Sequence, residues 1–221
     1  MDKLEEMRNN KDIAAAFKWL FIGLLCCFFV SYITSMNETI FNLVFLAFGG
    51  KAYFVYLILE LVLCFVLALA LPKMKPITAA ICYILYTAVT GLSLTGIFLV
   101  YTRSSIAFVF LVTAIVFGLF AVIGYTTKVD LSKFGIYLLV ALIAIILLSI
   151  VNIFLMNNTL DLVLCIVTII VFCGYVAFDI NRLTKMDCYF PNKGIYFAFQ
   201  LFLDFINIFI KLLRLLGKRN D

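Results

Sequence analysis

The stretch that decides the fold runs from Ile195 to Gly217 and reads IYFAFQLFLDFINIFIKLLRLLG. It is long enough for a helix that crosses a bilayer core of ~30 Å, since a helix rises ~1.5 Å per residue. Asp204 nevertheless lies near its centre. A carboxylate at mid-membrane costs roughly 2.5 to 3.5 kcal/mol on insertion scales, so such a helix should turn this residue toward protein or water. We therefore interpret the stretch as an interior helix of a membrane protein.

The polar side chains of this stretch lie along one face of the expected helix. They recur at intervals of three or four residues, which is the repeat of a 3.6-residue helix, at Gln200, Asp204, Asn207, Lys211 and Arg214. Two interpretations of Asp204 are open. It is either a functional carboxylate or one member of a structural ion pair with Lys211 or with a basic residue of another helix.

The whole chain has the composition of an integral membrane protein. Of its 221 residues 66% are hydrophobic and only 13% are charged, and the mean hydropathy is +1.19. The apolar runs are long and lack alternation, which favours an all-α bundle. We expect seven transmembrane helices, over residues 13–35, 52–71, 77–101, 105–126, 134–155, 160–182 and 195–216.

These helices would form a single transmembrane domain over 13–217, between a short charged N-terminus (1–12) and a basic tail (218–221). The apolar connection 36–50 either lies on the membrane or dips into it. Lysine and arginine are more frequent on the side of the N-terminus, so the positive-inside rule places that end in the cytoplasm. The basic tail then lies on the disfavoured side if the last helix spans, whereas a re-entrant helix would return it; we favour spanning because of the length.

The chain has seven cysteines and no histidine. The lack of histidine excludes imidazole metal sites and Ser–His or Cys–His nucleophile pairs. The cysteines lie mostly in apolar runs and form no C-x-x-C pair, so we interpret them as small buried side chains. The net charge of +5 belongs mainly to loops and ends beside the lipid bilayer. We therefore expect no cofactor and no nucleic-acid partner.

Of the twelve acidic residues, three lie within apolar runs, namely Glu60, Asp179 and Asp204. Intramembrane carboxylates are functional candidates by default, and without histidine they indicate the handling of protons or hard cations such as calcium. Their depths from one side of the membrane are ~18 Å for Glu60, ~5 to 9 Å for Asp179 and ~13 Å for Asp204. The sixth and seventh helices are joined on that side, so these depths allow Asp179 to pair with Asp204.

Two carboxylates in a medium of low dielectric would share one proton, because both cannot easily be ionised together. Calcium takes about six to eight oxygen ligands. The pair would supply some of them, and others would come from water, carbonyls and the side chains of Tyr175, Gln200 and Asn207. We therefore hypothesise a site that is either protonated and closed or ionised and cation-accepting. Arg182, near the end of the sixth helix, is a cationic partner for the pair or extends to lipid phosphates.

Four motifs resemble signatures of the Bax inhibitor-1 family, and together they cover roughly residues 50 to 217. They are YTAVTGLSL (Tyr86–Leu94), GYTTKVDL (Gly124–Leu131), AFDINRL (Ala177–Leu183) and QLFLDFINIF (Gln200–Phe209). The short N-terminus is similar to that of bacterial members. The resemblance implies a bacterial plasma-membrane protein of seven helices, in which the last helix is central between two layers of three helices.

The resemblance also implies a pH-sensitive calcium leak, in which Asp179 and Asp204 form the diaspartyl pH sensor. Some members are proposed to latch the closed state through an arginine of the second helix. Here that helix has Glu60 and no basic residue before Lys73, so Glu60 would instead add a third carboxylate to the cation path or share a proton with an aspartate. The partners would be calcium ions and protons.

The resemblance offers an alternative function as well. Some relatives are described as modulators of a membrane protease or as suppressors of cell death, which would require a protein partner in the membrane. An enzyme is not expected. Paired aspartates occur in intramembrane aspartyl proteases, but the G-x-G-D motif of those enzymes is absent around Asp179 and Asp204.

Overall fold

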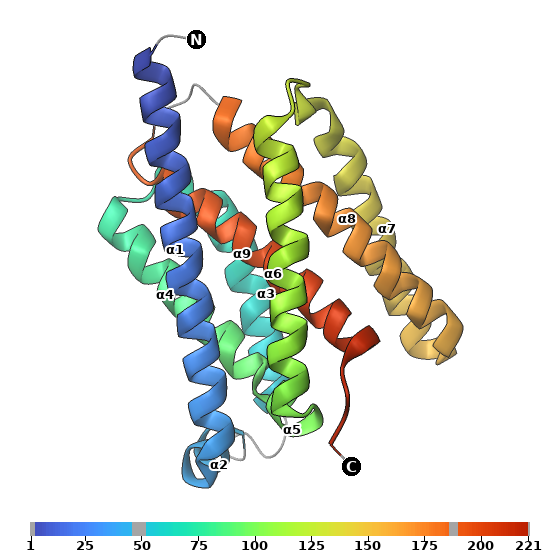
Figure 1. The fold of residues 1–221 in the computed structure, drawn as a ribbon. Coiled ribbons are helices and arrows are strands. Elements are labelled where there is room, and N and C mark those ends of the chain that lie inside the picture. The colour runs from blue at the N-terminus through green and yellow to red at the C-terminus, as the bar shows by residue number, and fades with distance from the viewer. Residues whose placement is uncertain (1–2, 46–51, 186–189, 221) are drawn as a thin grey trace. The chain divides into compact units, whose positions relative to one another are not determined.

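The computed structural model describes residues 3–45, 52–185 and 190–220, which are helical over most of their length (Figure 1). The helices are α1 (Lys3–Met36), α2 (Glu38–Phe45), α3 (Ala52–Ala70), α4 (Pro76–Ser93), α5 (Thr95–Val100), α6 (Arg103–Thr126), α7 (Gly135–Leu155), α8 (Asn158–Lys185) and α9 (Lys193–Leu216). Two short 3₁₀ turns, η1 (Leu71–Lys73) and η2 (Leu131–Phe134), precede α4 and α7. The all-α membrane class predicted from the sequence is therefore confirmed.

Within the described residues, six helical stretches are long and apolar enough to cross a membrane. They are Asn10–Met36, Pro76–Val100, Arg103–Thr126, Leu131–Leu155, Asn158–Lys185 and Lys193–Leu216. The remaining predicted span, 52–71, corresponds to α3, several of whose side chains lie outside the described part of the chain. The count of seven spans therefore stays a prediction.

Local chemistry explains where several helices begin and end. Pro72 lies at the start of η1 and Pro76 opens α4, positions where the missing N–H of proline costs no helical hydrogen bond. The predicted third span is divided at Leu94, between α4 and α5. The predicted N-terminal region is helical from Lys3 and continuous with the first span. The connection 36–50 contains α2, and its residues 46–50 lie outside the described residues.

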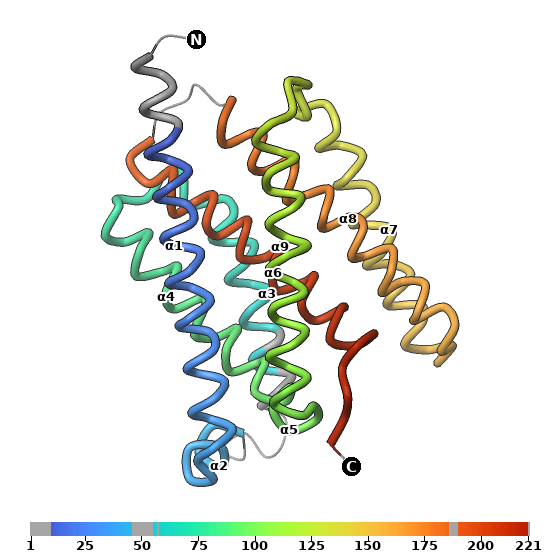
Figure 2. Tube along the Cα trace, in the orientation of Figure 1, coloured from blue at the N-terminus to red at the C-terminus, as the bar shows by residue number. Residues whose placement is uncertain are grey.

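The chain divides into two compact units, each with its own set of contacts. The first unit comprises Met1–Thr102, Cys188–Phe202 and Arg219–Asp221, and the second comprises Arg103–Asp187 and Leu203–Lys218. One unbroken helix, α9, contributes its first part to the first unit and its second part to the second (Figure 2). The single transmembrane domain and the central position of the last helix between two layers stay predictions.

Burial sets α9 apart from the other candidate spans. In its most apolar window 72% of the residues are buried, against 39% or less in the other five. The interpretation of this stretch as an interior helix is therefore confirmed. Aromatic side chains supply much of the packing: in the first unit Phe199 lies 5.2 Å from Tyr86, and in the second Phe205 lies 5.3 Å from Phe110, measured between ring centroids.

The basic tail after α9 is held against the connection between α5 and α6. In the first unit the main-chain N–H of Asn220 donates to the carbonyl of Val100 at 2.9 Å, and Arg219 forms an isolated antiparallel bridge with Tyr101. In the second unit the N–H of Lys218 donates to the hydroxyl of Ser105 at 2.8 Å. A re-entrant last helix would instead return the tail toward the connections on the N-terminal side, so these bonds favour a spanning α9.

The tail contacts predict that a reporter fused after Asp221 faces the same side as one inserted beside Arg103, opposite to the N-terminus. Alkaline phosphatase, active only outside the cytoplasm, should be active at both positions, and a fluorescent protein should fluoresce only at the N-terminus. Phosphatase activity at Arg103 without activity at Asp221 would contradict a spanning α9.

Candidate functional site

The candidate site is built around Asp179 of α8 and Asp204 of α9, which both belong to the second unit. Their side chains are buried, with residues 5% and 4% exposed. The two carboxyl groups lie within hydrogen-bonding range of each other. The structure therefore brings together the two aspartates that the sequence analysis singled out.

One oxygen of this pair is left without a partner. Asp204 Oδ2 is buried and accepts no hydrogen bond from the described residues. Neither aspartate forms a salt bridge within the described part of the chain, so the alternative of an ion pair between Asp204 and Lys211 is not what the structure shows. A buried carboxyl oxygen without a donor is costly, so this oxygen marks the place where a proton, a water molecule or a cation would be stabilised.

A small set of polar groups surrounds the pair in the second unit. On α8, Tyr175 and Cys173 lie close enough to interact electrostatically with Asp204, and Tyr175 also interacts with Asp179. Arg182, one turn beyond Asp179 on the same helix, acts on it electrostatically. Tyr175 is held between Phe172 and Phe178, at ring distances of 5.8 and 6.4 Å.

Other predicted members of the polar stripe have different partners. Asn207 donates to the carbonyl of Leu203 in its own helix at 2.8 Å. Gln200, in the first unit, donates to the hydroxyl of Tyr196 at 3.0 Å, and its Oε1 is buried without a donor among the described residues. A ligand role for either amide stays a prediction.

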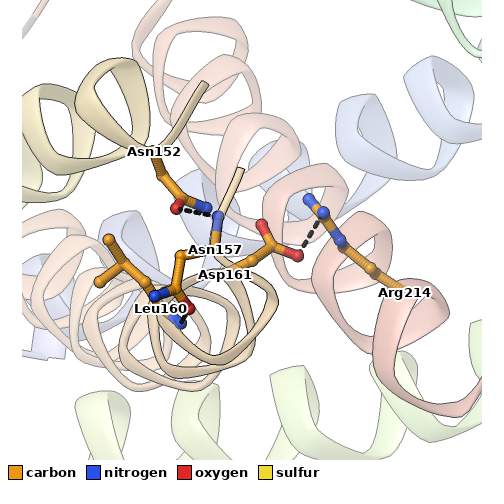
Figure 3. Close-up of polar contacts among 5 residues, drawn as sticks. All are labelled: Asn152, Asn157, Leu160, Asp161 and Arg214. Atoms are coloured by element: carbon orange, nitrogen blue, oxygen red, sulfur yellow. Dashed lines mark hydrogen bonds and ion pairs between the residues drawn. The ribbon is translucent and has the colours of Figure 1, made fainter. Parts of the chain in front are cut away.

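The basic residues of the polar stripe lie near the C-terminal end of α9. Arg214 forms an ion pair with Asp161 in the first turn of α8 (Figure 3). Asn157 caps this turn by accepting from the N–H of Leu160 at 3.0 Å, and its own N–H donates to Asn152 at 3.2 Å. The pair joins α8 and α9 at this end, while Lys211 lies half-buried between it and Asp204.

Glu60 is half-buried on α3, in the first unit. It lies close enough to Cys64 and Tyr86 to interact with them electrostatically. Its proposed place in the cation path stays a prediction.

Two residues that the sequence analysis quoted only as parts of motifs join α6 and the turn after it to α8, next to Asp179 in the sequence. A Cβ at Gly124 of α6 would collide with the carbonyl oxygen of Ala177 and would lie 2.8 Å from its Cα, so only glycine allows this approach of α6 to α8. Asn181 is 1% exposed. Its amide donates to the carbonyls of Gly124 and Val129 at 3.2 and 3.3 Å and accepts from the N–H of Leu131 at 3.0 Å.

Asn181 therefore ties the end of α6 and the following turn to α8, two residues beyond Asp179. In the sequence, the signal for this role was the position of a polar residue, Asn181, two places after the candidate carboxylate Asp179. The three hydrogen bonds that satisfy it depend on main-chain groups about fifty positions away, and no local pattern predicts them. The ion pair of Asp161 was missed for a similar reason, since Asp161 lies at the edge of its apolar run.

The acidic and thiol side chains that the structure describes form no closed metal cage. Within the described residues no group of three or more His, Cys, Asp or Glu side chains is placed to hold a metal ion. The six described cysteines are free, and Cys188 lies outside the described residues. A cation at the pair would therefore have two carboxyl groups as its charged ligands, and water or carbonyl oxygens would complete its shell.

The close contact at Gly124 predicts a sharp difference between two glycines of α6. Gly124→Ala should lower the unfolding free energy by about 1 to 3 kcal/mol, the usual cost of overpacking. Gly118→Ala is the matched control, because no atom lies within 4 Å of a Cβ built there. It should be neutral or stabilise the helix by up to about 1 kcal/mol. Thermal unfolding in detergent measures both, and equal effects of the two substitutions would contradict the tight contact.

Comparison with known proteins adds evidence independent of this geometry. The family described as inhibitor of apoptosis-promoting Bax1 matches residues 9–221. The inner membrane protein YbhL of Escherichia coli strain K12 is 37% identical over 216 residues, which covers 94% of this chain and 91% of the relative.

Two uncharacterized bacterial proteins are also similar over almost their whole length. One, from Borreliella burgdorferi, is 35% identical over 227 residues and covers 100% of this chain and 97% of the relative. The other, from Caulobacter vibrioides, is 33% identical over 229 residues, with 96% and 90% covered. These matches and the six apolar helices indicate an integral protein of a bacterial inner membrane.

Proposed function

This chain belongs to the Bax inhibitor-1 family, and from that premise we propose that it is a pH-sensitive calcium leak, gated by protonation of the Asp179–Asp204 pair. The observation that carries the proposal is the placement of two buried carboxyl groups within hydrogen-bonding range, without a salt bridge in the described residues. Such an arrangement is costly for stability alone, because it buries two acids where one apolar pair would pack more favourably.

The protonation state of the pair controls how α8 and α9 interact. With one shared proton the carboxyl groups form a hydrogen bond that holds the two helices together. Loss of that proton as the pH rises leaves two negative charges in close contact, which repel each other. The groups that bias this equilibrium are Arg182, Tyr175 and Cys173 of α8. Cation flux should therefore increase from acidic to alkaline pH.

Calcium is the cargo of the proposed leak. A divalent cation offsets the repulsion of two ionised aspartates, and the unpartnered Oδ2 of Asp204 provides an available oxygen. A site with only two carboxyl groups and water binds a cation weakly enough to release it, which conduction requires. Glu60 is a further candidate for the path. If it contributes charge there, Glu60→Gln should lower the rate of flux without removing its pH dependence.

The gating proposal is tested by calcium uptake into proteoliposomes at several pH values. In the unaltered protein the uptake should rise from acidic to alkaline pH, because loss of the shared proton leaves both carboxyl groups ionised. Asp179→Asn and Asp204→Asn each keep a hydrogen-bonding side chain but remove a titrating group. Each should flatten the pH dependence to less than about twofold over that range.

Glu38→Gln provides the control, since Glu38 is an exposed acid on α2 and its replacement should leave the profile unchanged. Uptake no faster than in protein-free liposomes at every pH would overturn the leak itself. A full pH dependence in both aspartate variants would leave a leak without the proposed gate.

A further inference from the structure

An open hollow of about 480 Å³ lies where α6, η2 and the end of α8 meet, entirely within the second unit. It is lined by Lys128, Asp130, Ser132, Arg182 and Lys185. Ligand pockets in proteins commonly measure about 300 to 1,000 Å³, so the volume suits a small ligand or headgroup. The hollow does not include the aspartate pair, and the proposed leak does not account for it.

The frame of this hollow is held by specific hydrogen bonds. The side chain of Asn181 donates to the carbonyl of Val129 and accepts from the N–H of Leu131. Asp130 accepts from the N–H of Ser132 at 2.9 Å, which shapes the turn into η2. Lys185 donates to the carbonyls of Lys128 and Val129 at 3.1 and 2.6 Å. The lining residues are thus positioned by their backbone before any ligand arrives.

The charge of the lining is positive. Three cations face one carboxylate, and that carboxylate is ionised at neutral pH. The hydrogen bonds from Ser132 and the nearby ammonium groups of Lys185 and Lys133 hold the pKa of Asp130 below its usual range. The excess of positive charge favours an anion in the hollow.

The basic side chains that line the hollow also have N–H donors that the described residues leave unused. Arg182 is half-buried, and its guanidinium has no hydrogen-bond or ion-pair partner among the described residues. Lys185 uses two of its three N–H groups on carbonyls, and one remains. Lys128 is exposed, and its ammonium group has no hydrogen-bond or ion-pair partner in the part of the chain that the structure describes. An arginine fork beside two ammonium groups is well matched to the tetrahedral oxygens of a phosphate group.

We propose that this hollow, named here the Arg182 pocket, binds a phosphate group, either of an anionic lipid headgroup or of free inorganic phosphate. The pocket lies at the ends of two candidate spans, in the turn that follows Arg103–Thr126 and at the last residues of Asn158–Lys185, where a headgroup phosphate would be found. Basic pockets at the ends of transmembrane helices bind anionic headgroups in this way. The proposal does not depend on calcium conduction.

The test uses the full-length protein purified in an uncharged detergent. Its thermal unfolding is followed with inorganic phosphate and with chloride at equal ionic strength. Native mass spectrometry then counts lipids retained from phosphatidylglycerol and from phosphatidylcholine, whose choline cation opposes the pocket. We expect specific stabilisation or retention by at least one phosphate ligand over its control.

Arg182→Gln and Lys128→Gln should each weaken that binding at least about tenfold, the loss expected from removing one strong charge-assisted contact. Lys133→Gln removes the same charge from an exposed residue of η2 that does not line the hollow, and it should bind as the unaltered protein does. Lys128→Gln leaves α8 intact and serves if Arg182→Gln fails to fold.

Phosphatidylglycerol and inorganic phosphate distinguish the two sources of the bound phosphate group. Retention of phosphatidylglycerol without an effect of inorganic phosphate identifies a lipid site, and stabilisation by inorganic phosphate identifies a site for the free anion. No preference for either ligand over its control would overturn the proposal. An equal loss in Lys133→Gln and in the two pocket variants would also overturn it, because only the general charge of this edge would then matter.

Discussion

The structure depends on the cost of placing a carboxyl group inside an apolar helix bundle. An aspartate at the depth of Asp204 cannot face lipid without a large penalty, so α9 is the most buried of the candidate spans. Burial alone does not remove the penalty, because a buried carboxyl group needs a hydrogen-bond partner. Asp179 supplies that partner from α8. This polar contact therefore accounts for the face that α9 turns toward α8.

The helix α6 packs against both helices that carry the carboxyl pair, α8 and α9. Gly124 lets α6 approach α8 at Ala177, and Asn181 fastens the turn after α6 to the same helix. On α9, Phe205 packs against Phe110 and Phe117 of α6 at ring distances of 5.3 and 5.6 Å. The carboxyl pair thus lies among α6, α8 and α9 of the second unit, which are joined by close packing and hydrogen bonds.

The last turns of α8 connect the two sites discussed above. Asp179 belongs to the carboxyl pair, Asn181 binds the turn after α6, and Arg182 lines the hollow named the Arg182 pocket. Arg182 also acts electrostatically on Asp179. A phosphate group bound to Arg182 would offset part of its positive charge, and the pair would then lie in a less positive potential. In the two proposals, the short motif Ala177–Leu183 therefore combines packing, proton chemistry and ligand binding in two helical turns.

Much of this arrangement could be predicted from the sequence, because membrane burial makes single charged residues informative. The apolar runs predict where most of the long helices lie, Pro72 and Pro76 mark the boundary before α4, and Asp204 marks the interior helix. Long-range contacts could not be predicted in the same way. The bonds of Asn181, the closeness of Gly124 to Ala177 and the pairing of Asp161 with Arg214 each join residues more than forty positions apart. They depend on the packed bundle rather than on local periodicity.

The central claim is that Asp179 and Asp204 hold one proton between them, and that its release admits a cation. Infrared difference spectroscopy of the protein in lipid measures the carbonyl stretch of a protonated carboxyl group directly. The account predicts a protonated-carboxyl band at acidic pH that disappears as the pH rises, over the same range in which calcium uptake begins, and that is lost or shifted in Asp204→Asn. A spectrum without such a band at acidic pH, or a band unchanged across the range in which uptake changes, would contradict it.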